Sequence, residues 1–162
     1  MQAHALRVAV IAETLPDDPD ARSMAMAAGM LHDIGKMILG LPSRSGGAGP
    51  GDPGRLRTDI ERARHGCTHA EVGGHLLGLW GLPQPLIEAV TFHHRPSLLG
   101  DVHLSAAGAV HVADWLATHC PCQGGGDDPH ERLDTDYLSR VDRLHCLPAW
   151  QQRHCTGEIG HE

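Results

Sequence analysis

The stretch His32-Asp33-Ile34-Gly35-Lys36 (HDIGK) decides the fold, because it sets a histidine and an aspartate side by side in apolar surroundings. Burying either group alone costs on the order of several kcal/mol, so such groups are buried only when they are paired or bind a metal. At helical spacing, His32 lies in line with Ala28 and Leu39. This alignment predicts that His32 faces the core of a helical protein.

Further polar residues recur on the apolar faces of other predicted helices. Steps of three and four residues place each of them on one helix face together with apolar side chains. These sets are His4 with Val8 and Ile11, His69 with Val72 and Leu76, His93 and His94 with Leu86 and Val90, and Asp114 with Ala107 and Val110. One such residue could be accidental, but five helices that share the pattern predict a polar site at the centre of a bundle.

Composition favours a single all-α domain that is soluble and cytoplasmic. Alanine, leucine and glycine dominate the 162 residues and aromatic residues make up only 3%, so long strands are not expected. No apolar stretch approaches the roughly 20 residues of a membrane span, and no signal peptide is visible. The net charge of −7 argues against nucleic acid as a partner, since phosphate binding needs basic patches.

The helix signals along the chain predict a bundle of about six to seven helices. The first has no cap before it, which suggests that the chain is cut from a longer polypeptide with a missing N-terminal domain. Residues 1–120 are expected to form the main domain, and residues 121–162 to add a loop, a helix and a tail that pack on it. The expected helices run from residue 2 or 3 to Leu15, from an Asp20 cap to about Leu39, over 55–65, from a Thr68–Glu71 capping box to Trp80, from Pro83 to His94, over 104–119 and over 134–144, with a poorly ordered loop at 40–54.

The five cysteines do not suggest a disulfide framework, because their number is odd and the chain is expected to be cytoplasmic. Cys120 and Cys122, together with the pairs His145-Cys146 and His154-Cys155, match no standard zinc spacing. The cysteines are therefore expected in loops or at the surface.

The polar set is typical of a metal site that acts on phosphate esters. Adjacent His and Asp residues project about 100° apart on a helix, close enough to serve one metal cluster. A mixed imidazole and carboxylate shell suits iron, manganese, zinc or nickel. Two such cations about 3.5–4 Å apart could activate water and hold a phosphoryl oxygen.

Lys36, one turn beyond His32, could neutralise a phosphate or could instead interact with carbonyls at its helix end. Asp33 and Lys36 are thus the candidate catalytic residues, and a phosphate-containing small molecule is the expected ligand.

The order His, His-Asp, His, His-His, Asp resembles the HD superfamily of metal-dependent phosphohydrolases, and HDIGK resembles the form found in its HD-GYP and HDOD subfamilies. The segments at 69–83, 89–96 and 110–117 most resemble HDOD domains. The resemblance covers nearly all of residues 4–117 and implies an HD-type helical bundle. It also implies a ligand set in which His4, His32, Asp33 and Asp114 bind a first metal, and Asp33 bridges to a second metal held by His69, His93 and His94.

Two hypotheses about function follow from this resemblance. The GYP element is missing after the double histidine, where Arg95-Pro96 stands, and this weakens the expectation of cyclic-di-GMP hydrolysis. Many HDOD domains are signalling modules, so the favoured hypothesis is a metal-binding signal-transduction domain. It would form the output part of a response-regulator-like protein and act on a signalling protein partner. The alternative is an active phosphohydrolase for a nucleotide or cyclic nucleotide. Single histidines could also be core or capping residues, and His111, one turn before Asp114, is the nearest rival.

Overall fold

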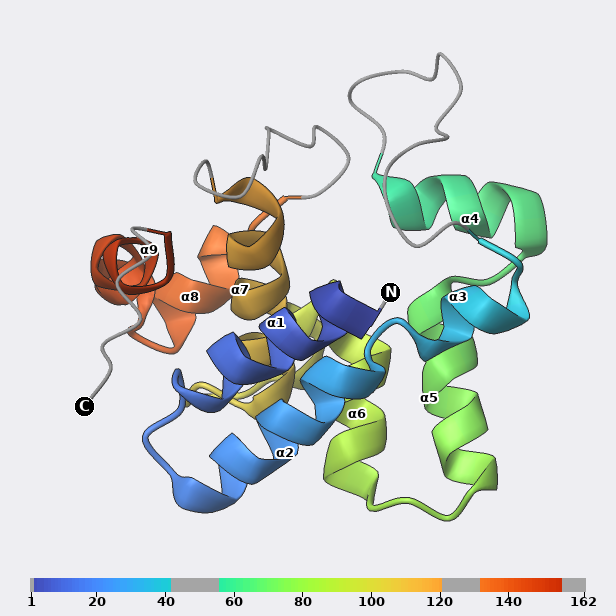
Figure 1. The fold of residues 1–162 in the computed structure, drawn as a ribbon, viewed down its shortest axis with the longest axis horizontal. Coiled ribbons are helices and arrows are strands. Elements are labelled where there is room, and N and C mark those ends of the chain that lie inside the picture. The colour runs from blue at the N-terminus through green and yellow to red at the C-terminus, as the bar shows by residue number, and fades with distance from the viewer. Residues whose placement is uncertain (1, 42–55, 121–131, 156–162) are drawn as a thin grey trace.

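The computed structural model describes residues 2–41, 56–120 and 132–155, and these residues form helices and connecting turns without strands. This confirms the predicted all-α fold (Figure 1). The helical elements are α1 (Gln2–Glu13), α2 (Pro19–Leu31), α3 (Ile34–Ile38), α4 (Arg57–His65), α5 (His69–Leu79), α6 (Gln84–Phe92), η1 (Pro96–Leu99), α7 (Ala106–His119), α8 (Thr135–Arg140), η3 (Leu144–Cys146) and α9 (Leu147–Cys155).

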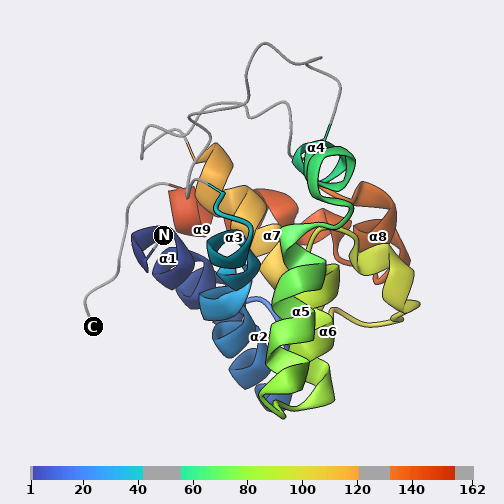
Figure 2. The same cartoon turned by 90° about the vertical axis from the view of Figure 1, so that its right-hand side faces the viewer.

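Helix α7 lies at the centre of the bundle and is buried along most of its length. It packs against α1, α2 and α6, while α5 packs against α3 and α6 (Figures 1 and 2). Small side chains let these helices approach closely. A Cβ atom added at Gly29 on α2 would come within 2.7 Å of the Cα atom of Ala9 on α1. The backbones of α1 and α2 are therefore closely spaced at this point of the core.

Two helix starts illustrate how local sequence sets the fold. The predicted capping box of α5 is present: the Glu71 N–H donates to the Thr68 hydroxyl, and the Thr68 N–H donates to the Glu71 carboxylate. The prediction of Asp20 as the cap of α2 was wrong. Asp18 accepts the Ala21 N–H at 2.8 Å, because Pro19 begins the helix one residue later with its φ already fixed.

The helix expected to continue to about Leu39 is broken at the HDIGK stretch. α2 ends at Leu31 and α3 begins at Ile34, with Asp33 between them at φ −96° and ψ 5°. The break turns α3 against α5, where a Cβ atom added at Gly35 would overlap the backbone carbonyl of His69. Only glycine fits at this contact. The expected loop over 40–54 lies, from residue 42 onward, outside the described residues.

The C-terminal segment differs from the expectation of a helix over 134–144 followed by a loose tail. α8 ends at Arg140, and a further helix, α9, begins at Leu147. Tyr137 of α8 is fully buried, and its ring lies where a side chain at Gly108 of α7 would stand. α8 is therefore anchored to the central helix.

The expectation that the cysteines lie free in loops or at the surface was wrong for two of them. Cys120, at the end of α7, is fully buried and forms a disulfide with Cys155 of α9. The two are 35 residues apart, and their pairing depends on the way α9 folds back toward α7. Cys67 and Cys146 are free thiols, and Cys122 lies outside the described residues.

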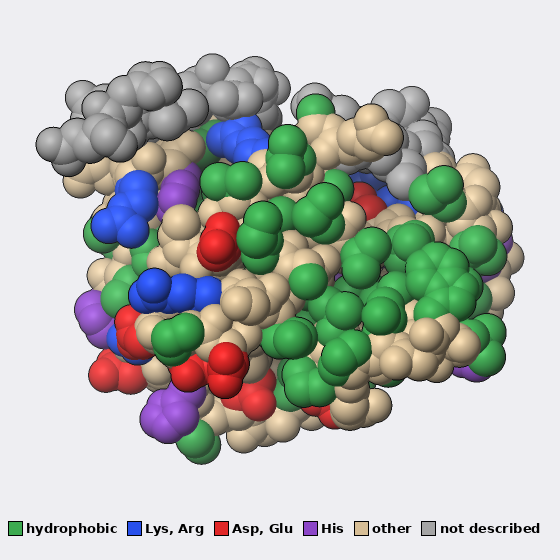
Figure 3. Space-filling view, turned by 60° about the horizontal axis from the view of Figure 1, so that its bottom comes forward, with side chains coloured by type: hydrophobic (Ala, Val, Ile, Leu, Met, Phe, Trp, Pro, Cys, Tyr) green, Lys and Arg blue, Asp and Glu red, His purple; other side chains and the backbone are tan. Residues whose placement is uncertain are grey.

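One face of the molecule gathers hydrophobic side chains (Figure 3). Among the described residues, the large apolar side chains that remain exposed include Met26 and Met30 on α2 and Leu79 and Trp80 at the end of α5. Contiguous exposed apolar surface is typical of contact sites for partners. No helix in the described part of the chain combines the length and apolar character needed to cross a membrane.

Candidate metal centre

The structure brings all seven predicted ligands together from six different helical elements. Most sit at helix ends, where the backbone turns and aims a side chain inward. His32, His69 and His93 are fully buried, Asp33 and Asp114 are nearly so, and His4 and His94 are partly buried. The positions are His4 on α1, His32 after α2, Asp33 before α3, His69 at the first residue of α5, His93 and His94 after α6, and Asp114 on α7.

The first group of donor atoms comes from His4, His32 and Asp33, whose ligand atoms all lie within 4.8 Å of one another. Asp114 lies beside them. Its Oδ1 atom is 2.9 Å from Nε2 of His4 and 3.9 Å from Nε2 of His32. His4, His32 and Asp33 have the spacing of a candidate site for one cation, and Asp114 lies close enough to His4 to join them.

The second group comes from His69, His93 and His94, again with ligand atoms within 4.8 Å of one another. Nε2 of His69 lies 3.0 Å from Nε2 of His94. Asp33 stands between the groups, because its Oδ1 atom is 3.4 Å from Nε2 of His69 and 3.5 Å from Nε2 of His32. The arrangement thus offers two adjacent sites with a carboxylate between them.

Backbone hydrogen bonds orient two of the buried rings toward this centre. Nδ1 of His32 lies 2.7 Å from the Gly29 carbonyl, and Nδ1 of His93 lies 2.7 Å from the Val90 carbonyl. Because a carbonyl oxygen can only accept, Nδ1 is the donor in both rings and Nε2 faces the centre.

The donor atoms that face the centre show whether a metal ion would fit there. Nε2 of His32, Nε2 of His93 and Oδ2 of Asp33 are buried without a hydrogen bond to the described protein, while Oδ1 of Asp33 has an ion pair with Lys36. Buried polar atoms are almost always satisfied, and unpaired ones cost about 1–3 kcal/mol each. Imidazole nitrogens and carboxylate oxygens are the donors that divalent transition metals take. The residues present therefore fit one or two such cations.

The charge states of the ligands also suit metal binding. Burial raises the pKa of Asp33, but His32 and Lys36 outweigh it and lower the pKa to about 2. Burial and neighbouring imidazoles hold the pKa of His93 and of His94 well below 6.5. At neutral pH these groups are an ionised carboxylate and neutral rings, which are the forms that bind cations.

Lys36, the second candidate catalytic residue, lies beside the central carboxylate. Its side chain is buried, and its Nζ atom lies 2.7 Å from Oδ1 of Asp33. The ammonium group thus pairs with the central carboxylate.

Glu61 of α4 belongs to the site and was missed in the sequence. Its carboxylate accepts the backbone N–H of His69 at 2.9 Å and lies 2.7 Å from Nδ1 of the same ring. Burial raises the pKa of Glu61, but the two hydrogen bonds from His69 and the nearby charges of His69 and Lys36 together lower it by more, so the pKa lies below its ordinary value. The only signal in the sequence was its spacing of three from Thr58, which puts both on one face of an otherwise polar helix.

His111, the nearest rival among the other histidines, lies beside the centre. Its Nδ1 atom donates to the His93 carbonyl at 2.7 Å, and its Nε2 atom accepts the Asp134 N–H at 2.8 Å. Both nitrogens are therefore used. The ring links α7 to the backbone that carries the double histidine and to the segment before α8.

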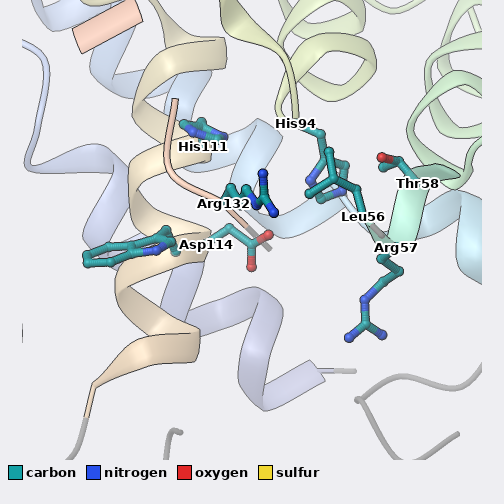
Figure 4. Close-up of a pocket in the computed structure, with 8 residues that line it drawn as sticks. Leu56, Arg57, Thr58, His94, His111, Asp114 and Arg132 are labelled. Carbon is teal, nitrogen blue, oxygen red and sulfur yellow. The ribbon is translucent and has the colours of Figure 1, made fainter. Parts of the chain in front are cut away.

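The centre opens into a pocket between α4 and α7 (Figure 4). The space in the pocket, including the open mouth, is about 410 Å³. His94 and Asp114 belong to both the centre and the pocket wall, so a molecule in the pocket would reach the candidate ligands. The lining residues are Leu56, Arg57, Thr58, His94, His111, Asp114, Trp115 and Arg132.

The helical fold and the paired groups of histidine and aspartate define an HD-type domain with a candidate metal centre. The family model of the HDOD domain matches residues 1–96, more than half of the chain, and the chain belongs to this family.

A solved structure described as a "Putative phosphohydrolase", from Shewanella amazonensis SB2B, has a similar fold with a TM-score of 0.63 at 20% sequence identity. The similarity covers 97% of this chain and 59% of that chain, so this chain spans about three fifths of the other protein's length. A comparison with curated proteins finds no significant match.

Proposed function

We propose that this HDOD-family domain binds two divalent cations in the candidate metal centre and hydrolyses a phosphoester or phosphoanhydride. The observation that carries the proposal is the convergence of seven donor residues in which Nε2 of His32, Nε2 of His93 and Oδ2 of Asp33 are buried without a hydrogen bond to the described protein. The similar fold of a protein described as a phosphohydrolase agrees with it.

The proposal gives each residue a role. His4, His32, Asp33 and Asp114 would hold one cation. His69, His93 and His94 would hold the other, with Asp33 shared between the two. The donor set suits iron, manganese, zinc or nickel, and a cation pair would supply Lewis-acid activation of the phosphoester toward water.

The chain's own residues prepare this chemistry before any substrate arrives. Lys36 holds the Oδ1 atom of Asp33 and offsets part of the negative charge of the two aspartates. Glu61 fixes the ring of His69 through Nδ1, which leaves Nε2 directed at Asp33. A phosphate-containing small molecule would enter through the pocket beside His94 and Asp114.

A second candidate function is a signal-transduction module in which the metals only stabilise the fold. The hydrophobic side chains gathered on one face favour it, because they offer a contact surface for a signalling protein partner. Under this second hypothesis the chain would be the output part of a response-regulator-like protein. We propose a cytoplasmic location for either function, where reducing conditions would keep Cys120 and Cys155 partly as thiols.

Metal analysis followed by phosphatase assays separates the two functions. The purified protein is expected to contain one or two equivalents of metal, and Asp33→Ala should lose most of it because the shared carboxylate is removed. Asp136→Ala, a change of an exposed carboxylate on α8, is the matched control and should keep the metal.

The wild-type protein loaded with manganese or zinc should cleave an activated phosphodiester, and Asp33→Ala should not. Metal retained in full by Asp33→Ala would refute the centre as described. Turnover no higher than that of the variant, in a protein that does hold metal, would favour the signalling module.

A further inference from the structure

The ring of His111 holds the peptide group that joins the two adjacent histidines of the metal centre. His111 lies on α7 and is only 5% exposed, and its Nδ1 atom donates to the His93 carbonyl at 2.7 Å. In Figure 4 it lies on the side of α7 that is turned toward His94. The His93 carbonyl and the His94 nitrogen belong to one planar peptide. A hydrogen bond that fixes this plane therefore constrains ψ of His93 and φ of His94, and with them the directions of both side chains.

This carbonyl stands where the helix itself offers no donor. His93 is the C-cap residue of α6, and the last carbonyls of a helix lack an intrahelical partner. Among the described residues, it is His111 that donates to this carbonyl. The rings of His93 and His94 lie close together, with their centroids 4.0 Å apart. A rotation of this one peptide would therefore displace two of the three donors in the second group.

The C-terminal segment holds His111 through its other nitrogen. The Asp134 N–H donates to Nε2 of His111 at 2.8 Å, so one neutral tautomer, with its proton on Nδ1, satisfies both contacts of the ring. Asp134 is the N-cap residue of α8, and its carboxylate accepts the Tyr137 N–H at 2.9 Å. Tyr137 is fully buried against α7. A continuous series of contacts thus leads from α8 through His111 to the double histidine.

We propose that His111 is a positioning residue that couples the second cation site to the docking of α8. While α8 is docked, Asp134 holds the ring of His111, and the ring holds the His93 carbonyl. Because coupling between two sites is reciprocal, a cation bound by the second group also strengthens the docking of α8. The inference rests on the proposed function in that it takes His69, His93 and His94 as a cation site, and it requires no turnover.

The coupling would belong to a part of the chain that the family match does not include. The match ends at residue 96, whereas both His111 and Asp134 lie beyond it. The C-terminal segment would then support the metal centre and set its affinity for the second cation.

Titration of the full-length, metal-free chain with cobalt(II), in competition with a chromophoric chelator, measures both affinities and records the visible spectrum of each bound cation. His111→Phe keeps a ring of similar size and removes both hydrogen bonds. It should weaken the second cation about 10–100-fold, change the spectrum of that cation and spare the cation beside His4. His119→Phe is the matched control, because it makes the same change on α7 in a ring that bonds the Trp115 carbonyl at 2.9 Å. It should bind both cations as the wild type does.

Asp134→Ala tests the same connection from the side of α8. It removes the cap of α8 and touches no candidate ligand, so it should weaken the second cation by less than His111→Phe does. In the double variant it should add no further loss, because the connection is already broken at His111. Hydrogen–deuterium exchange gives the reciprocal measurement. Cobalt should slow exchange in α8 of the wild type and should not do so in His111→Phe.

Circular dichroism checks the fold of each variant. If His111→Phe does not fold, His111→Asn replaces it. The shorter side chain keeps a donor near the place of Nδ1 but has no acceptor that reaches Asp134, so cobalt should no longer slow exchange in α8.

Three results would overturn the proposal: wild-type affinity for both cations in the His111 variant, a loss shared equally with His119→Phe, or additive losses in the double variant. A protein that takes up two cobalt ions with the expected coupling but hydrolyses no phosphoester would refute the proposed hydrolysis and leave the coupling intact. A wild-type protein that takes up no cobalt would refute both.

Discussion

Glu61→Gln tests the site through a residue that touches no proposed cation. In the wild type, the Glu61 carboxylate accepts both the backbone N–H of His69 and the N–H of its ring. A glutamine of nearly the same size has one acceptor oxygen and an amide group that donates. Both N–H groups meet the Oε2 atom, so the glutamine oxygen can replace that atom, but the amide group then stands where Oε1 lies 2.9 Å from Nδ1 and sets a donor against a donor. The negative charge is lost as well.

The size of the effect follows from these two hydrogen bonds. A hydrogen bond to a charged group contributes about 1.5–3 kcal/mol, so the metal-free variant should lose about 2–3 kcal/mol of unfolding free energy. Removal of a partner that orients a metal-binding histidine typically costs about 10–100-fold in metal affinity. The loss should fall on the cation held by His69, His93 and His94 and spare the cation beside His4.

Urea denaturation of the metal-free protein measures the first effect, and competition with a chromophoric chelator measures the second. Glu71→Gln on α5 is the matched control. It changes a half-exposed carboxylate in the capping box, so it should cost about 1 kcal/mol or less and leave both metal affinities intact. If Glu61→Gln binds both cations as the wild type does and unfolds at the same urea concentration, Glu61 does not position His69.

Three further predictions concern other parts of the structure. The metal-free protein should lose stability as pH falls from about 7.5 to about 5.5. The reason is that His93 and His94 stay neutral in the folded protein, whereas the histidines of the unfolded chain gain protons below 6.5. A urea midpoint that does not change over this pH range would contradict this. Reduction of the Cys120–Cys155 disulfide should lower the free energy of unfolding by about 3–4 kcal/mol and lower the melting temperature. Cys120→Ser, which cannot form the bond, should show this lower melting temperature both with and without reductant. Gly35→Ala should lower the melting temperature and the metal content together, because the new methyl group would overlap the α5 backbone. A variant that matches the wild type in both measurements would exclude the close contact between α3 and α5.

Most of the fold could be predicted because its signals are local. The capping box at Thr68 and the proline at Pro83 each mark a helix start within a few residues, and the structure follows both. The break at Asp33 could not be predicted in this way. It depends on the approach of α3 to α5 at Gly35, a contact between segments 34 residues apart (69 minus 35).

The candidate ligands could be predicted because each is a polar residue on an apolar face. Glu61 shows no such contrast, since it lies on a short helix rich in charged residues and is buried only through its contact with His69. The same reasoning applies to the disulfide. Neither cysteine carries a local signal of its partner, and only the path of α9 across the bundle brings Cys155 to Cys120.

The position of Asp114 on α7 bears on how a minimal version of this domain should be cut. The family match ends at residue 96, immediately after the double histidine. A fragment cut there would retain six of the seven candidate ligands but lose Asp114, the anchoring contact of His111 with His93 and the central helix of the core. The unit defined by sequence similarity is therefore smaller than the unit that can assemble the site, and a shortened protein intended to bind metal should extend at least through α7.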